Sequence, residues 1–299
     1  MREAAYVLPE SATVSDSPAE IRLSVATLRH GERVEVLERT RNWARVRIAD
    51  GRSGWIELAN ILEGKAYEEG QTLLRELLNE QPQASGHTSG SANLRVQPSR
   101  DAAQLAQLSA SQKVEIFRRQ MVERPPPPSG VPASGEPIRD AWYLVRADSK
   151  AGWVLGRLVS LDVPAAIENY AQNVNLVAWL VLNSVDDNGR AVPQYLAADR
   201  EDTPDADFTH IRVFTWWSKR QEYVTAYVES NLNGYFPIRV SAVDGVPHFR
   251  LRLQDPDGRK FQKIYQMRET IVHPIGTVEG WEGDAVPERR PMTRSRRRR

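Results

Sequence analysis

One sequence pattern occurs twice in the first half of this chain, and it limits what the chain can fold into. The first copy occupies residues 12–56, and the second occupies residues 92–154 with an insertion. In both copies a proline, Pro18 or Pro98, precedes a leucine by ten residues. Each copy ends in Gly-Trp followed by a β-branched residue. Two copies of one small module are typical of a binding protein rather than of an enzyme with a single active site.

Alternating apolar residues predict that each copy is built from short strands. Val34 and Val36 alternate with polar residues in the first copy, and so do Val46 and Ile48. Alternation of this kind indicates strands with one buried face. The sequence ADGR at 49–52 adds a tight turn, because Asp-Gly readily adopts the positive φ angles of a two-residue hairpin.

Both copies resemble the bacterial SH3 (SH3b) domain, whose pattern starts near N-R-x-P, continues with W-x-x-V and ends in G-x-x-G-W-[IV]. The second copy matches the start with NLRVQP at 93–98, where the first copy has no arginine. The first copy matches the end, with Trp43-Ala44-Arg45-Val46 and then GRSGWI at 51–56. The second copy ends in Trp142-Tyr143-Leu144-Val145 and KAGWV at 150–154. The resemblance covers about half of the chain.

The resemblance implies two small barrels of five to seven strands and a role at the bacterial cell envelope. Related domains bind peptidoglycan or contact other proteins, so we expect a peptidoglycan stem peptide or an envelope protein as partner. The layout is similar to that of envelope lipoproteins of uncharacterised function. We therefore expect a periplasmic or outer-envelope protein, with lipid anchoring through a leader not present in this chain as a further expectation.

The residues between and after the two copies differ in composition. Leu73, Leu74, Leu77 and Leu78 recur at helical spacing and predict a connecting helix. The polar Gly/Ser/Pro stretch that follows predicts a flexible linker. The resulting domain organisation is an SH3b-like domain at 1–62, a connecting helix and linker at 63–91, a second SH3b-like domain at 92–163 with a Pro-rich insert at 122–137, a C-terminal β domain at 164–283 and a basic disordered tail at 284–299.

The C-terminal region predicts an antiparallel β domain. Seven apolar, alternating segments are separated mainly by turns containing Asn-Gly or Asp-Gly, which are strong hairpin signals. They are residues 175–182, 192–198, 210–217, 222–230, 235–240, 248–253 and 260–267. The predicted fold class is therefore all-β: two tandem SH3b-like barrels joined by a short helix and linker, then an antiparallel barrel or sandwich of 7–8 strands.

The charge distribution gives no sign of a folded nucleic-acid-binding surface. Seven arginines lie at 289–299, and the rest of the chain has 33 basic and 39 acidic residues, a net charge of about −6. A nucleic-acid-binding domain places its basic charge on a folded face. We therefore expect no specific nucleic-acid partner, although the basic tail could contact an anionic surface. No apolar run approaches the roughly 20 residues of a membrane helix.

Aromatic residues are the first candidates for ligand contact. Trp43 and Trp142 are predicted to fill the barrel cores, because one indole occupies much of so small an interior. Trp55 and Trp153 either join the core or line a groove, where an exposed indole would stack on a sugar or an apolar side chain. Arg95 is a candidate for pairing with a carboxylate, such as that of a stem peptide, against the simpler interpretation of an intradomain contact.

The densest aromatic cluster lies in the predicted hairpin at 210–230. Trp216 and Trp217 are adjacent, so on a strand they face opposite sides, and we expect one of them to be exposed. Tyr223 and Tyr227 share one face by period two, opposite an aliphatic face that we expect to be buried. Trp216, Trp217 and Tyr223 are the binding candidates of this domain, against the alternative of purely structural cross-strand pairing.

No motif for catalysis, metal binding or a cofactor is present. The chain has no cysteine, and its five histidines form no H-x-x-x-H or H-E-x-x-H spacing. The acidic stretch at 199–207 lacks the glycine and terminal glutamate of an EF-hand, and a solvated loop is the preferred interpretation. We therefore expect a non-catalytic binding protein without metal or cofactor. The alternatives are an envelope hydrolase using His210 or His248 with this acidic loop, and a purely structural protein.

Overall fold

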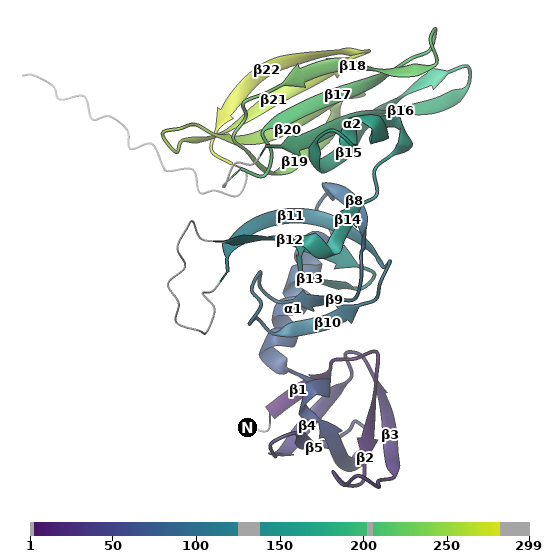
Figure 1. Cartoon of the computed structure of the whole chain (residues 1–299), viewed down its shortest axis with the longest axis vertical. Helices are drawn as coiled ribbons and strands as arrows, with labels where there is room; N and C mark the ends of the chain where they lie inside the picture. Colours follow the sequence, from purple (N-terminus) through teal and green to yellow (C-terminus); the bar gives the residue numbers. More distant parts are fainter. Residues whose placement is uncertain (1–2, 125–137, 202–205, 282–299) are drawn as a thin grey trace, which may run out of the picture.

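Three β units follow one another along the long axis of the molecule (Figure 1). The computed structural model describes residues 3–124, 138–201 and 206–281. Most of the Pro-rich insert, part of the acidic stretch at 199–207 and the basic tail lie outside these described residues. Within the described residues, no helix is both long enough and apolar enough to cross a membrane.

The first unit is a seven-stranded antiparallel sheet that curls around one apolar core. Its strands follow the order β3-β2-β6-β5-β4-β1-β7. Inward-facing Val14, Val34, Val46 and Ile56 alternate with exposed neighbours and are almost completely buried. The strands are β1 (Glu3–Val7), β2 (Ser11–Ser15), β3 (Ser24–Arg29), β4 (Arg33–Arg39), β5 (Trp43–Arg47), β6 (Ser53–Glu57) and β7 (Ile61–Glu63).

The second unit repeats this topology strand for strand. Its order is β10-β9-β13-β12-β11-β8-β14, in which every strand takes the place of its counterpart in the first unit. A short 3-10 turn precedes the last strand in both units, at Leu58–Asn60 and at Gly156–Leu158. The two small barrels predicted from the repeat are thereby confirmed. The strands are β8 (Ala84–Thr88), β9 (Ala92–Arg95), β10 (Gln104–Leu108), β11 (Lys113–Glu123), β12 (Arg139–Ala147), β13 (Lys150–Leu155) and β14 (Val159–Leu161).

The expectation of a flexible linker before residue 92 was wrong. Residues Ala84–Thr88 form β8, which pairs with β11 on one side and β14 on the other. The strand is polar in composition, but backbone pairing does not require apolar side chains. A Cβ atom on Gly86 would lie 2.4 Å from the carbonyl oxygen of Ser160, so the neighbouring strand leaves room for glycine alone.

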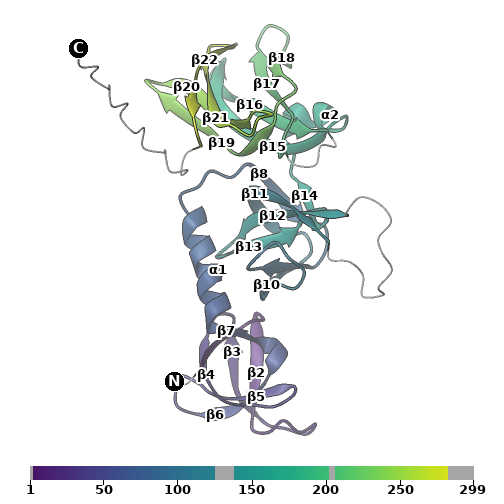
Figure 2. The same ribbon diagram turned by 90° about the vertical axis from the view of Figure 1, so that its left-hand side faces the viewer.

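The predicted connecting helix is α1 (Gly64–Leu77), which lies along the side of the second barrel (Figure 2). Leu77 is fully buried, and Leu73 and Leu74 pack against the same apolar cluster of the barrel. Leu78, the residue after the helix, is 61% exposed. The helix therefore buries one leucine stripe on the second barrel, as its spacing predicted.

The third unit consists of two four-stranded antiparallel sheets that enclose one core as a half-barrel. Phe208, Phe249 and Tyr265 are fully buried in this core, which draws residues from both sheets. One sheet contains β15 (Asn175–Asp187), β16 (Arg190–Arg200), β17 (His210–Trp217) and β18 (Glu222–Glu229), and the other contains β19 (Gly234–Val243), β20 (Val246–Gln254), β21 (Lys260–Arg268) and β22 (Ile271–Glu279). These eight strands agree with the predicted antiparallel barrel or sandwich.

A second, smaller apolar cluster lies on the outer side of the β15–β18 sheet. Ile167, from the 3-10 turn Ala165–Ile167, and Tyr170, from α2 (Glu168–Ala171), pack there against Tyr195 and Phe214. The middle of this sheet is therefore covered on both faces, which agrees with the uninterrupted burial of residues 194–199 on β16. The short helical segment follows directly from the second barrel and caps this face (Figure 1).

Gln83 joins the second barrel to the half-barrel. Its side chain is completely buried, donates to the carbonyl oxygen of Ile238 (3.1 Å) and accepts from the Ile238 amide (2.6 Å). Its own carbonyl oxygen accepts from the Trp179 amide at 2.9 Å. Where the two units meet, Gln83 thus satisfies backbone groups of β19 through its side chain and of β15 through its own carbonyl oxygen.

Candidate binding surface

The tryptophans of the two Gly-Trp motifs occupy equivalent positions in the two barrels. Trp55 pairs in register with Ser15, and Trp153 pairs with Arg95 in the same way. The preceding glycine is required sterically, because a Cβ atom on Gly54 would lie 2.6 Å from the Ser15 carbonyl oxygen. In the second barrel, a Cβ atom on Gly152 would likewise lie 2.8 Å from the Arg95 carbonyl oxygen. Both indoles therefore lie on the same outer face of their barrel.

In the second barrel, helix α1 covers this face. Phe117 and Leu144 are fully buried and Ala151 is 3% exposed, and Trp153 packs with them under the leucines of α1. This intramolecular helix occupies the surface that a ligand of Trp153 would need. A role for Trp153 in ligand contact stays an untested prediction.

Arg95 is engaged within its own barrel. Its guanidinium Nη1 donates to the carbonyl oxygen of Ala102 at 2.6 Å, across the loop that joins β9 to β10. This hydrogen bond agrees with the interpretation of Arg95 as a residue that makes a contact within its own domain. Its pairing with a ligand carboxylate stays a prediction.

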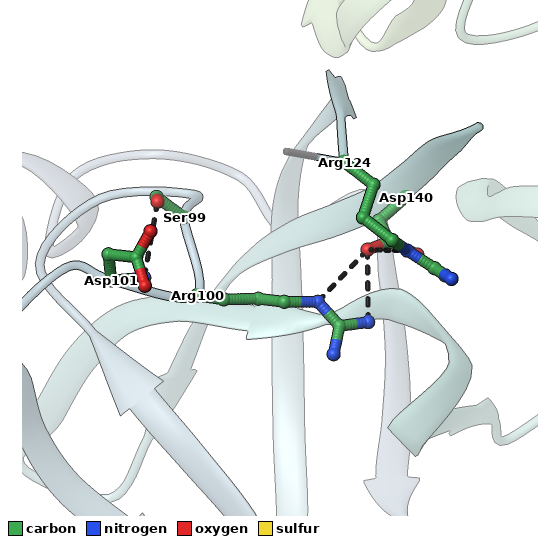
Figure 3. A network of polar contacts seen from close by, with 5 residues as sticks. All are labelled: Ser99, Arg100, Asp101, Arg124 and Asp140. Atoms are coloured by element: carbon green, nitrogen blue, oxygen red, sulfur yellow. Dashed lines mark hydrogen bonds and ion pairs between the residues drawn. The ribbon is translucent and has the colours of Figure 1, made fainter. Parts of the chain in front are cut away.

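A network of ion pairs fastens the 96–103 loop of the second barrel to strand β12 (Figure 3). Arg100 Nη2 lies 3.0 Å from Asp140 Oδ2, and Arg124 Nη2 lies 2.7 Å from Asp140 Oδ1. The two guanidinium groups hold the pKa of the Asp140 carboxyl below its ordinary value. Ser99 Oγ also accepts from the Asp101 amide at 3.3 Å. Arg100 therefore ties the middle of the loop to strand β12.

Among the described residues, no helix covers the equivalent face of the first barrel. Strand register places Arg45 opposite Trp55, where the second barrel has the buried Leu144 opposite Trp153. Leu37 forms a β-bulge in β4, and Phe117 forms the equivalent bulge in β11 of the second barrel. Arg45 is exposed, and Trp55 and Leu37 are only half-buried. An indole and a guanidinium thus lie side by side on an open sheet face.

The neighbouring 16–23 loop adds apolar surface to this face. Ile21 is 93% exposed and Leu23 is 75% exposed, which is unusual for large aliphatic side chains on one short loop. Arg22, between them, lies 4.8 Å above the centre of the Trp43 ring.

Trp142 is buried, at 3% exposed, but it lies on the same side of β12 as Leu144 and is not part of the apolar cluster inside the second barrel. Trp43 is half-buried on the outer face of the first barrel. The expectation that these two tryptophans fill the barrel interiors was therefore wrong.

The aromatic residues of the β17–β18 hairpin lie in two environments. Trp216 Nε1 donates to Asp187 Oδ2 at 3.0 Å, and the Tyr223 hydroxyl donates to the Pro193 carbonyl oxygen at 2.9 Å. Their rings pack edge to face at 5.1 Å. Trp217, on the opposite side of the strand, is 39% exposed, and the Arg220 guanidinium lies 4.3 Å above its ring. Trp217 is thus the exposed indole that alternation predicted.

The expectation that Tyr223 and Tyr227 share one face was wrong. A β-bulge at Ala226 shifts the register between Val213 and Phe214, so alternation is interrupted between the two tyrosines. Tyr223 packs in the outer cluster of its sheet, while Tyr227 packs against the inner core and donates to Glu229 at 2.7 Å. The bulge leaves no trace in the apolar pattern of the strand.

A cavity of about 370 Å³ contains His210, the histidine named in the enzyme alternative. Its ring lies 3.6 Å from an Asp199 oxygen and 3.7 Å from a Glu201 oxygen. The Tyr170 hydroxyl donates to Asp199. Burial of the Tyr170 phenol is the main cause that raises its pKa above the ordinary value, and the Asp199 carboxylate raises this pKa further. His248 lies on the other sheet, so the two histidines do not converge. Among the described residues, no group of three potential ligands could hold a metal ion.

The family of bacterial SH3 domains matches residues 24–61 and 90–160. These segments fall in the two barrels, so the chain contains bacterial SH3 domains in tandem. The resemblance inferred from the Gly-Trp motifs is thereby confirmed.

Solved structures give a weaker likeness. NlpC2 from Trichomonas vaginalis is 12% identical, with 93% of this chain and 97% of that chain covered and a TM-score of 0.19. An NlpC/P60 family protein from Bacillus cereus is 10% identical, with 91% and 98% covered and a TM-score of 0.23. Scores this low support no argument about this chain. No curated protein sequence matches it.

Proposed function

We propose that this chain is a non-catalytic binding protein of the bacterial cell envelope that recognises a cell-wall peptide or a protein partner through its SH3 modules. Bacterial SH3 domains are associated with the envelope and with cell-wall binding, and this chain contains two of them. The proposal assigns the two modules different tasks: the first binds, and the second supports the half-barrel and the connecting helix.

The difference between the two equivalent faces is the observation that supports this assignment. In the second module, α1 covers Trp153, and ion pairs at Asp140 fasten the neighbouring loop. In the first module, Trp55 and Arg45 lie on an open face beside the exposed Ile21. Exposed apolar side chains that adjoin one another on a surface mark interaction sites, and Ile21 and Leu23 add to the apolar surface beside Trp55.

The chemistry of this face fits a short peptide with a carboxylate. The Trp55 indole offers a flat apolar surface to an aliphatic side chain or a sugar face. The Arg45 guanidinium, opposite it in register, can hold a carboxylate through two parallel N–H···O bonds. Ile21 and Leu23 extend the apolar contact along the loop.

Co-sedimentation with purified peptidoglycan sacculi tests the proposal. The full-length chain is used with Arg294 and Arg296 to Arg299 changed to serine, which removes charge-driven binding by the basic tail. We expect Trp55→Ala and Arg45→Ala each to weaken binding about tenfold, whereas Arg29→Ala, an exposed arginine on β3, leaves it unchanged. Binding that none of these changes alters would disprove the assignment to the first module, and no binding at all would redirect the search to protein partners.

The cavity around His210 supports one alternative, an envelope hydrolase. A histidine between two carboxylates, with a tyrosine hydroxyl on one of them, is a possible general acid–base arrangement. Release of soluble fragments from sacculi by the purified chain, abolished by His210→Ala, would favour this activity over simple binding. Absence of release with intact sacculus binding would favour the adaptor.

A further inference from the structure

A cavity of about 330 Å³ lies where helix α1 leaves the first barrel and runs along the second (Figure 2). Its walls come from the His30-Gly31 turn of the first barrel, from one side of α1, and from β10 and the β12–β13 turn of the second barrel. None of its lining residues belongs to the open face around Trp55. An inference from this cavity therefore goes beyond the proposed function.

Two close contacts of α1 fix the walls of this cavity. The Tyr67 ring stacks on Tyr6 of the first barrel, with the ring centres 3.8 Å apart. A Cβ atom on Gly70 would lie 2.9 Å from the Leu105 side chain of the second barrel, so the glycine lets the helix approach this barrel closely. Both barrels hold the same helix, and the cavity is therefore formed before any ligand enters it.

Lys150, the first residue of β13, lines the cavity with a mostly buried side chain. This side chain is 17% exposed, and lysine is seldom so buried without a partner. The partner is Glu10 of the first barrel, whose carboxylate accepts a hydrogen bond from the Lys150 ammonium. The Glu10 side chain is itself 77% exposed. The pair thus combines a lysine held in the junction with a carboxylate that solvent reaches.

Glu10 also interacts with a second residue of the cavity, His30. The hydrogen bond and the charge of Lys150 hold the pKa of the Glu10 carboxyl below its ordinary value, and His30 adds a smaller effect in the same direction. The His30 amide donates to the Glu10 carbonyl oxygen at 3.3 Å. A carboxylate of the chain itself is thus held beside two residues that line the cavity.

The cavity offers hydrogen-bonding groups that the chain itself does not use. His30 Nδ1 lies 2.6 Å from the Leu8 carbonyl oxygen, which can only accept, so Nδ1 carries the proton and Nε2 of the neutral ring is an acceptor. Among the described residues, no hydrogen bond involves this Nε2 or the side chains of Tyr67, Gln71 and Ser149. Donors and acceptors therefore lie together with apolar residues in one cavity.

A short peptide with a free carboxylate matches these groups better than a fatty acid or a bare anion does. A fatty acid would leave the polar side chains without partners, which costs free energy in a closed site. A bare anion such as acetate would leave Leu62, Leu74 and Leu105 uncovered. A peptide end carries an amide donor, a carbonyl acceptor and a side chain next to its carboxylate. The volume is near the lower end for ligand pockets and limits the occupant to about two small residues.

We propose that this cavity binds the carboxylate end of a short peptide, and that Glu10 occupies the carboxylate position when the peptide is absent. The peptide carboxylate pairs with the Lys150 ammonium, and a peptide N–H donates to His30 Nε2. A small side chain of the peptide packs against Leu74 and Leu105. Glu10 then turns into solvent, where most of its surface already lies. One ligand thereby contacts the first barrel, α1 and the second barrel.

Isothermal titration of the full-length chain with acetyl-dialanine, in its L,L and D,D forms, tests this proposal. The same peptide with a C-terminal amide is the matched probe without the carboxylate. We expect the acid to bind about tenfold more tightly than the amide, because only the acid makes a charge-assisted hydrogen bond to Lys150. Trp55 and Arg45 stay unchanged in every sample, so the result is independent of the sacculus assay.

The two partners of the ion pair should change the affinity in opposite directions. Lys150→Gln removes the cation and should weaken binding of the acid about tenfold. Glu10→Gln removes the internal competitor and should tighten binding about threefold. An ion pair that only stabilised the junction would give changes of the same direction in both variants. Lys65→Gln and Glu68→Gln, at exposed positions of α1, make the same changes of charge and should alter the affinity less than about twofold.

Ser149→Trp keeps the test decisive if Lys150→Gln proves unstable. Ser149 is an exposed lining residue, so an indole there narrows the cavity without altering the ion pair, and we expect about a tenfold loss of affinity with unchanged thermal unfolding. Weaker binding by Glu10→Gln, equal binding of acid and amide, or no binding of either form to Glu10→Gln would overturn the proposal. Tighter binding of octanoate or acetate than of acetyl-dialanine would also overturn it.

Discussion

Arg119 and Asp207 form a buried ion pair between the second SH3 module and the half-barrel. Arg119 Nη1 lies 3.5 Å from Asp207 Oδ1, and the two side chains are 2% and 11% exposed. Asp207 Oδ2 also accepts from the Phe236 amide at 2.9 Å. Burial raises the pKa of Asp207 to about 6, against the opposing effects of the Phe236 amide and Arg119. The junction is therefore sensitive to pH.

The effect of Asp207→Asn on stability should depend on pH in a defined direction. An aspartate whose pKa rises from 3.8 to about 6 on folding stabilises the protein most when it is protonated. This contribution, on the order of 2–3 kcal/mol, is complete below about pH 4 and is lost as pH rises through about 6. Asparagine does not titrate, so its cost relative to aspartate should be largest in acid and should shrink toward pH 7.

Urea unfolding of both proteins at pH 4, 5, 6 and 7 measures this difference, because other titrating groups cancel in the comparison. A difference in unfolding free energy that stays constant across this range would contradict the raised pKa. A difference that grows toward neutral pH would mean that the ion pair with Arg119, rather than burial, dominates.

Gln83→Met should destabilise the contact between the second barrel and the half-barrel. Methionine fills a similar volume but leaves the amide and the carbonyl oxygen of Ile238 without their partner. Unpaired buried backbone groups cost about 1–3 kcal/mol each. Thermal unfolding measures the loss, and faster hydrogen exchange at the Ile238 amide locates it. Gln97→Met, on an exposed loop, serves as the control and should change stability by less than about 0.5 kcal/mol.

Leu77→Ala and Leu78→Ala should differ sharply although the residues are neighbours. Leu77 is fully buried between α1 and the second barrel, whereas Leu78 is 61% exposed. We expect Leu77→Ala to cost about 2–5 kcal/mol through lost burial and the cavity that it leaves. Leu78→Ala should cost less than about 0.5 kcal/mol. Chemical denaturation of the two variants compares them, and similar losses would show that α1 does not close the Trp153 face in solution.

Much of the fold follows from local patterns. Two Gly-Trp endings at similar spacing predicted two barrels of one kind, since each glycine is needed where its strand meets a neighbouring carbonyl. Asp-Gly and Asn-Gly turns predicted the antiparallel C-terminal sheets, because only a few residues adopt positive φ angles at low cost. The leucine spacing of α1 predicted a helix with one buried stripe.

Other features depended on partners distant in the sequence. The polar composition of Ala84–Thr88 predicts a linker, yet the segment forms a strand, because its pairing with β11 and β14 requires no apolar pattern. The bulge at Ala226 separated Tyr223 from Tyr227 without any change in the alternation of the strand. Both errors arise where the backbone, rather than the side chains, determines the pairing.

The sequence by itself determined the modules: two small β units whose motifs resemble bacterial SH3 domains, and a connecting helix and an antiparallel C-terminal β domain that follow from short-range periodicity and turn residues. Only the tertiary structure decided how equivalent residues differ. Trp55 and Trp153 follow the same motif, yet α1 packs over the second and leaves the first on an open face. Likewise, Glu10 and Lys150 meet only because α1 packs against both barrels. Exposure and charge pairing depend on which distant segments meet, and this information is not contained in any local pattern.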